Sequence, residues 1–91
     1  MLKHIVEVNH DRSQGMVVIE YTITDGTRTS HAQECISELV PYFQIVRLCE
    51  GRTAVRILDQ GFYMAVCKQL KRKAQDHFHG EVITEIRMNE R

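Results

Sequence analysis

Residues 16–24 read MVVIEYTIT, and this stretch decides the fold expected of the chain. Most of its residues are β-branched, the type that fits a pleated sheet best. Apolar side chains recur at every second position, which is typical of a strand with one buried face. The pattern predicts that four side chains share that face: Val17, Ile19, Tyr21 and Ile23.

The residues on either side extend the β-structure. Residues 2–8 are expected to form a shorter strand, joined to the first by the polar connection 9–15 in a loose antiparallel hairpin. On the other side, Asp25 and Gly26 have turn chemistry and should end the strand.

Residues 30–43 are expected to form a helix. Ser30 and Gln33 have the spacing of a capping box at its start. Pro41, the only proline, should end or kink it near residues 39–40. The helix would bury one apolar stripe of Ala32, Cys35, Ile36, Leu39, Val40 and Phe43.

The second half of the chain repeats the alternation of strand and helix. Two strands, residues 45–49 and 54–58, are predicted around a glycine-centred link. A second helix should begin at Asp59, a good N-cap, and end before Gly80, which suits the position after a helix. Its buried stripe would be Phe62, Val66, Leu70, Ala74 and Phe78, with Tyr63, Cys67 and His77 beside it.

A last strand is predicted over residues 82–88, so the predicted order is β-β-α-β-β-α-β. This order indicates a single α+β domain over residues 1–91 with a ferredoxin-like (split βαβ) antiparallel sheet, two helices on one face and an extra N-terminal strand. The strand 16–24 already has two neighbours in that fold. Residues 2–8 must then pair elsewhere or with a second chain, or the C-terminal strand must move to a sheet edge.

Composition narrows the class of protein. Twelve Lys and Arg balance twelve Asp and Glu, so the whole molecule has no net charge to attract nucleic acid or anionic lipid. No apolar run approaches the ~20 residues that span a bilayer, and residues 1–7 lack the core of a signal peptide. Three widely spaced cysteines argue against a disulfide framework. A cytoplasmic protein with no membrane partner is expected.

The usual motifs of catalysis and metal binding do not occur. Cys35, Cys49 and Cys67 lack a CxxC spacing and are expected to be structural. His77 and His79 are the only close histidine pair, and on a helix they would point about 200° apart. We expect no metal site, no cofactor and no catalytic residue of a known type.

Two short stretches keep alternative functions open. Residues 9–14 gather an imidazole, a carboxylate, a guanidinium and a hydroxyl, which are groups for acid–base chemistry, although exposed connections often contain them. Lys68, Lys71 and Arg72 would project from one face of the second helix and could follow phosphates. The ordinary interpretation is a solvated face, and few aromatic side chains are free to stack on bases. We expect any nucleic-acid binding to be weak.

The side chains on the sheet face away from the helices predict self-association. That face mixes apolar residues with charges of both signs, so opposite charges could pair across a two-fold axis. The alternative is a monomer with scattered exposed apolar residues, which are common. The predicted interface residues are Val18, Glu20, Arg56, Ile83 and Glu85.

The sequence therefore favours a small non-enzymatic binding or interaction module, a homodimer or an adaptor for another protein. The first alternative is a small-ligand sensor, of unknown ligand, or a nucleic-acid-binding accessory protein that uses the basic face of the second helix. The second is a small enzyme with its site at a dimer interface. The predicted fold cannot decide among them, because this architecture hosts many functions.

Overall fold

The computed structural model describes residues 2–76, 78 and 88–90. These residues form two sheets and one helix, which confirms the α+β class. Among them, no helix combines the length and the apolar character needed to cross a membrane.

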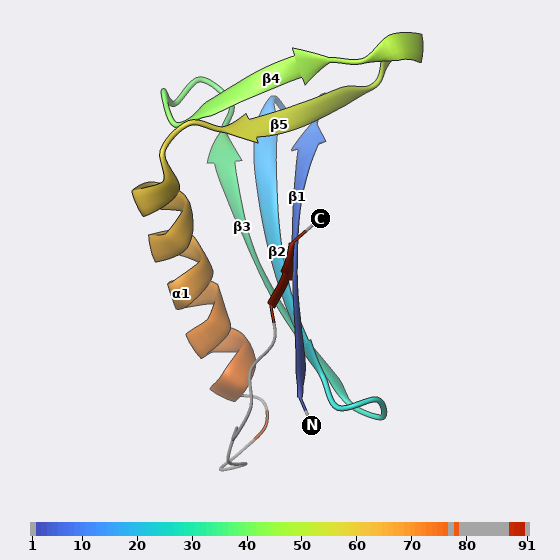
Figure 1. The fold of residues 1–91 in the computed structure, drawn as a ribbon, viewed down its shortest axis with the longest axis vertical. Coiled ribbons are helices and arrows are strands. Elements are labelled where there is room, and N and C mark those ends of the chain that lie inside the picture. The colour runs from blue at the N-terminus through green and yellow to red at the C-terminus, as the bar shows by residue number, and fades with distance from the viewer. Residues whose placement is uncertain (1, 77, 79–87, 91) are drawn as a thin grey trace.

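The larger sheet is an antiparallel meander of three strands extended by a short fourth (Figure 1). Each strand of the meander pairs along its whole length with the next one in the chain. The fourth strand lies parallel to the first, at the sheet edge. The strands are β1 (Lys3–Asp11), β2 (Met16–Thr24), β3 (Thr29–Ser37) and β6 (Met88–Glu90), in the order β3-β2-β1-β6.

The smaller sheet is a hairpin of β4 (Phe43–Arg47) and β5 (Thr53–Ile57), linked through a 3₁₀ turn at Cys49–Gly51. Figure 1 shows that it lies across one end of the meander and that its turn projects beyond β1. Both predicted strands of this hairpin are therefore present, each shifted by one or two residues.

The helix α1 (Gln60–Asp76) packs on one face of the meander against β2 and β3. Asp59 caps its start, as expected, because its Oδ1 accepts the N–H of Phe62 at 2.9 Å. The buried stripe is turned slightly from the predicted one, because Phe62 is only partly buried. The fully buried side chains of α1 are Tyr63, Cys67, Leu70 and Ala74.

The core confirms the burial predicted for β2. Its four alternating apolar side chains have no exposed surface and lie in the core between the sheet and α1. They are Val17, Ile19, Tyr21 and Ile23. Burying one side chain of this size stabilises the folded state by about 1.5–3 kcal/mol. The central strand therefore contributes a large share of the stability.

The helix predicted over residues 30–43 is wrong, and so is the ferredoxin-like order β-β-α-β-β-α-β, because the described residues form one helix and residues 29–37 form β3. Asp25 makes the turn that starts β3, because its Oδ1 accepts the N–H groups of Thr27 and Arg28 at 2.8 and 2.7 Å. Those hydrogen bonds lower the pKa of Asp25 to about 2. The tight turn brings residues 29–37 directly beside β2, and the two strands pair along their whole length.

Ser30, which the sequence predicts at the start of a helix, instead lies beside the end of α1. The Ser30 hydroxyl donates to the carbonyl of Ala74, in the last turn of α1, at 2.7 Å. Ser30, Ala32 and Ile36 all lie on the face of β3 that meets the helix, so the segment satisfies a period of two as well as a period near 3.6. Pairing with β2 decides between the two periods.

The structure shows where the N-terminal strand pairs, which the predicted fold left open because the strand 16–24 already had two neighbours in it. β1 pairs with β2 in a hairpin, since β3 rather than a helix follows β2. Of the predicted last strand, residues 82–87 lie outside the described residues, as does Gly80. Residues 88–90 form β6 at the sheet edge, which is one of the two expected alternatives.

A histidine lies in the core on the first strand. His4 has no exposed surface, and its Nδ1 is 2.7 Å from the hydroxyl of Tyr21. Its Nε2 has no hydrogen-bond partner among the described residues. Burial, helped by the charge of Lys71, lowers the pKa of His4 from the ordinary 6.5.

This lowered pKa makes stability depend on pH. As the pH falls below 6.5, the unfolded chain takes up the His4 proton before the folded chain does, so the free energy of unfolding should fall. The limiting slope is about 1.4 kcal/mol per pH unit. Urea unfolding at pH 7.5 and at pH 5 should show this loss, and the loss should be smaller in His4→Phe. An equal loss in both proteins would assign the acid sensitivity to other groups.

Candidate functional site

The hairpin is joined to the meander by one histidine at the end of β1. Nε2 of His10 lies 2.9 Å from Oε2 of Glu38, and Nδ1 lies 2.8 Å from Oγ1 of Thr53 on β5. In the tautomer of the neutral ring that donates Nε2–H to the Glu38 carboxylate, Nδ1 accepts the hydroxyl proton of Thr53. The His10 side chain is only 6% exposed. A hydroxyl, an imidazole and a carboxylate thus form one chain of hydrogen bonds.

Two further contacts hold this junction in place. Nη1 of Arg12 donates to the carbonyl of Gly51 at the hairpin turn, at 2.6 Å. The N–H of Glu38 donates to the carbonyl of Gly15 at 3.0 Å. Gly15 has a φ of 64°, and a Cβ there would lie 3.0 Å from Oε1 of Glu38. Glycine adopts this backbone conformation without strain and leaves room for the carboxylate.

A cavity of about 640 Å³ lies at this junction, within the size range of small-molecule sites. His10, Thr53 and Glu38 lie in its wall together with apolar Ile45 and Leu48. Three arginines also border it, namely Arg12, Arg47 and Arg52.

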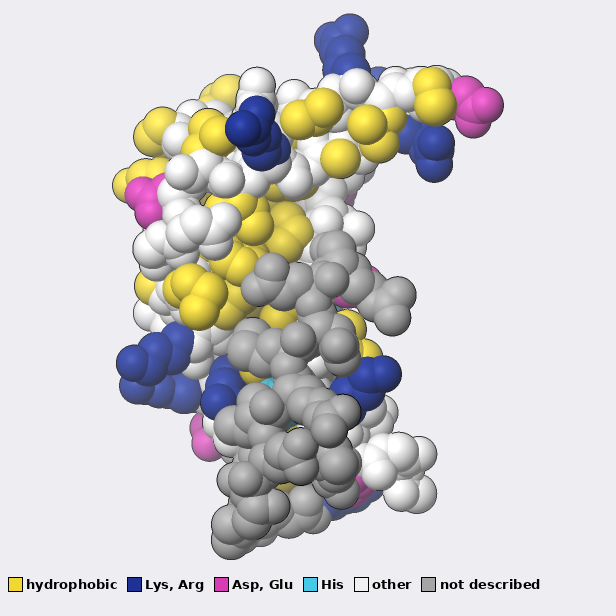
Figure 2. Space-filling model, in the orientation of Figure 1, with side chains coloured by type: hydrophobic (Ala, Val, Ile, Leu, Met, Phe, Trp, Pro, Cys, Tyr) yellow, Lys and Arg dark blue, Asp and Glu magenta, His cyan; other side chains and the backbone are white. Residues whose placement is uncertain are grey.

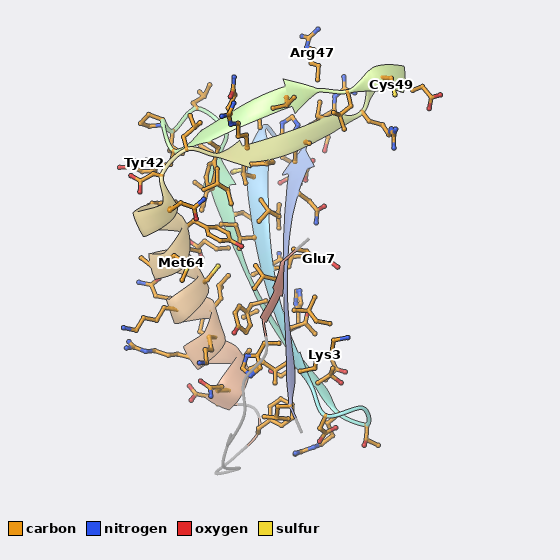
Figure 3. The ribbon with its side chains drawn as sticks, in the orientation of Figure 1. Lys3, Glu7, Tyr42, Arg47, Cys49 and Met64 are labelled. Carbon is orange, nitrogen blue, oxygen red and sulfur yellow. The ribbon has the colours of Figure 1, made fainter. Side chains whose placement is uncertain are left out.

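The arginines are not equivalent. Figure 3 shows the Arg47 side chain extending from β4 away from the meander, so its charge points out of the junction. Arg12 is tied to the hairpin turn, and Nη2 of Arg52 is 3.7 Å from Sγ of Cys49 in the same turn. Arg12 and Arg52 therefore supply the positive charge of the cavity.

Exposed apolar side chains gather at the same end of the molecule. Every large apolar side chain that the described residues expose belongs to the segment 39–64, which contains the hairpin and the first turns of α1. Figure 2 shows hydrophobic side chains along the hairpin. They are Leu39, Val46, Leu48, Leu58 and Met64.

The residues of the interface predicted on the sheet are only partly brought together. Val18 and Glu20 lie on the meander face opposite α1, which none of the described helices or strands covers. Glu7 stands directly across from Glu20, and Nε2 of His31 is 3.8 Å from Oε1 of Glu20. Arg56, in contrast, is on the separate hairpin. Ile83 and Glu85 lie outside the described residues.

The basic residues of α1 do not share one surface. Lys68 and Arg72 are exposed, whereas Lys71 is half-buried and its charge acts on His4. Of the three predicted residues, only Lys68 and Arg72 are thus exposed, which leaves a shorter stripe than the sequence predicts.

The cysteines and histidines are dispersed. Cys67 is buried in the core, whereas Cys35 and Cys49 are exposed. In the part of the chain that the structure describes, no three His, Cys, Asp or Glu side chains are placed to hold a metal ion. His77 and His79 lie outside that part.

The loop singled out in the sequence, residues 9–14, is divided by the fold. His10 and Arg12 reach the cavity. Oδ1 of Asp11 instead accepts the hydroxyl of Ser13 at 2.7 Å, which lowers the pKa of Asp11, so these two groups build the turn.

Two members of the junction were missed by sequence reasoning. Thr53 and Glu38 lie 43 and 28 positions from His10. No spacing rule connects them, because the hairpin brings Thr53 to His10 and the pairing of β3 with β2 brings Glu38 there.

Comparisons of the chain with models of protein families, with curated proteins and with solved structures found no match.

Proposed function

We propose that the chain is an interaction module that forms a homodimer through the hairpin β4–β5. The observation that carries this proposal is the confinement of the exposed large apolar side chains to the segment 39–64. Contiguous apolar surface rimmed by polar residues is characteristic of protein interfaces. A standard interface takes about 800 Å² from each partner, roughly an eighth of the 6278 Å² surface of this chain.

The outer edge of β4 supports a second copy as the partner. Among the described residues, β4 pairs only with β5, so its other edge has free backbone N–H and C=O groups. The strand carries no charge from Phe43 to Val46, and a two-stranded sheet alone is marginally stable. Pairing with β4 of a second copy completes a four-stranded sheet and buries Val46.

The charges allow this symmetric contact. In antiparallel pairing centred on Ile45, Arg47 faces Phe43 of the other copy. The two Arg47 Cα atoms are then roughly 14 Å apart along the strands, at four residues of about 3.4 Å each. This separation exceeds the screening length at physiological salt, so their repulsion is small. The zero net charge of the chain adds no repulsion.

Light scattering after size exclusion at tens of micromolar tests the proposal. The wild type should have twice the 10.6 kDa mass of one chain, and Val46→Glu should be a monomer. Val18→Glu, the same substitution on the open meander face, is the control and should remain a dimer. Circular dichroism verifies that both variants fold.

Two other results of this experiment would contradict an interface at the hairpin. A monomeric wild type excludes self-association of this kind. A monomer from Val18→Glu but not from Val46→Glu would move the interface to the open meander face, where Val18 and Glu20 lie.

A further inference from the structure

We infer that the cavity beneath the hairpin binds a small organic oxyanion, a carboxylate or a phosphate monoester, between Arg12 and Arg52. The two charged residues of this site come from the β1–β2 turn and from the hairpin turn of one chain, whereas its apolar wall shares Ile45 and Leu48 with the hairpin that we propose as the dimer contact.

The charge of the cavity favours an anion. Two guanidinium groups, Arg12 and Arg52, face one carboxylate, Glu38, and that carboxylate already accepts a hydrogen bond from His10 at 2.9 Å. The planar guanidinium fork matches the oxygen spacing of carboxylates and phosphates. The positive charge of Arg12 and Arg52 therefore exceeds the negative charge of Glu38 and can attract an anionic ligand.

The arginine donors are largely unused. A guanidinium has five N–H donors, and Arg12 uses one of them on the carbonyl of Gly51. Its other N–H groups donate to no described residue. The guanidinium of Arg52 contacts the Cys49 sulfur at 3.7 Å, and sulfur is a weak acceptor. An oxyanion would replace water at these donors.

The junction holds Arg12 and the backbone of the hairpin in place before a ligand arrives. The Arg12–Gly51 bond fixes the turn of the hairpin, and His10 fixes β5 through Thr53. Such preorganisation lowers the entropic cost of binding.

The size and the apolar wall indicate an organic ligand rather than a bare ion. At about 640 Å³ the cavity has room for a ring or a short chain, and Ile45 and Leu48 offer it an apolar surface. The expected ligand has one anionic end and one apolar end.

Phenyl phosphate and benzoate are the probes for the two oxyanions, and phenol is the uncharged control. In ¹H–¹⁵N NMR titrations, both anions should shift the amide resonances of Arg12, Leu48, Arg52 and Thr53, whereas phenol at the same concentration should not. Phenyl phosphate should bind more tightly because it carries more charge. If only one anion binds, its class is the ligand class.

Arg52→Gln provides the decisive variant. Loss of a charge-assisted hydrogen bond should weaken binding of phenyl phosphate at least about tenfold. Arg72→Gln, the same change on the exposed face of α1, should leave affinity within about twofold. Equal affinities in the two variants, or no shift at these amides, would overturn the inference. Light scattering of Arg52→Gln should still give the mass of the wild type, so failure of one proposal does not imply failure of the other.

Discussion

Tyr21→Ala should lower the free energy of unfolding by about 3–5 kcal/mol, the usual cost of emptying a buried aromatic site. Tyr21 has no exposed surface and stands edge-on to the ring of His4, with ring centroids 5.6 Å apart. Its hydroxyl lies 2.7 Å from Nδ1 of His4. Burial raises the pKa of Tyr21 to about 12, so the phenol is protonated across the stable pH range. The substitution leaves a cavity and a buried imidazole without its partner.

Urea unfolding at pH 7.5 measures this loss, and two variants separate its parts. Tyr21→Phe keeps the ring and removes only the hydroxyl, so it should cost about 1–3 kcal/mol through the unpaired imidazole. Thr22→Ala, on the opposite face of the same strand, should cost much less. A Tyr21→Ala loss no larger than that of Thr22→Ala would mean that β2 is not the central strand.

His10→Ala should release the hairpin from the meander. The substitution removes both hydrogen bonds of the imidazole and leaves Glu38 partly buried without its partner. We expect a loss of about 2–4 kcal/mol, because hydrogen bonds to charged groups contribute about 1.5–3 kcal/mol. Amide exchange measures the effect locally, and β4 and β5 should exchange much faster while β2 stays protected.

Thr53→Val tests the same junction from the other side. It keeps the shape of the side chain and removes one hydrogen bond. Amide exchange should therefore become faster in β4 and β5 again, but by less than in His10→Ala. If hairpin exchange does not change in His10→Ala, the apolar contacts of Phe43 and Ile57 hold the hairpin, and the polar junction serves the cavity alone.

Local chemistry was enough to predict several elements. The period-two pattern of residues 16–24 predicted β2 and its buried face, since alternation is a property of the strand itself. Asp59 at the start of α1 and Asp25–Gly26 at a turn were also predicted correctly, because capping and turn formation depend on neighbouring residues.

Residues 30–43 show where local chemistry is insufficient. Their spacing fits a helix, yet Ser30, Ala32 and Ile36 also fit one face of a strand. The free energy that decides between these periods comes from the hydrogen-bond ladder with β2 and from packing on α1, and neither can be read within the segment.

The central strand β2 and the helix α1 were thus determined by the sequence itself. The junction was decided by the tertiary structure alone. His10 meets Thr53, and Arg12 meets Gly51, because the hairpin folds across the end of the meander. Glu38 reaches His10 because β3 pairs with β2 along its whole length. A contact between residues so distant in the chain depends on the closure of long loops, whose entropy is offset only when the whole fold forms.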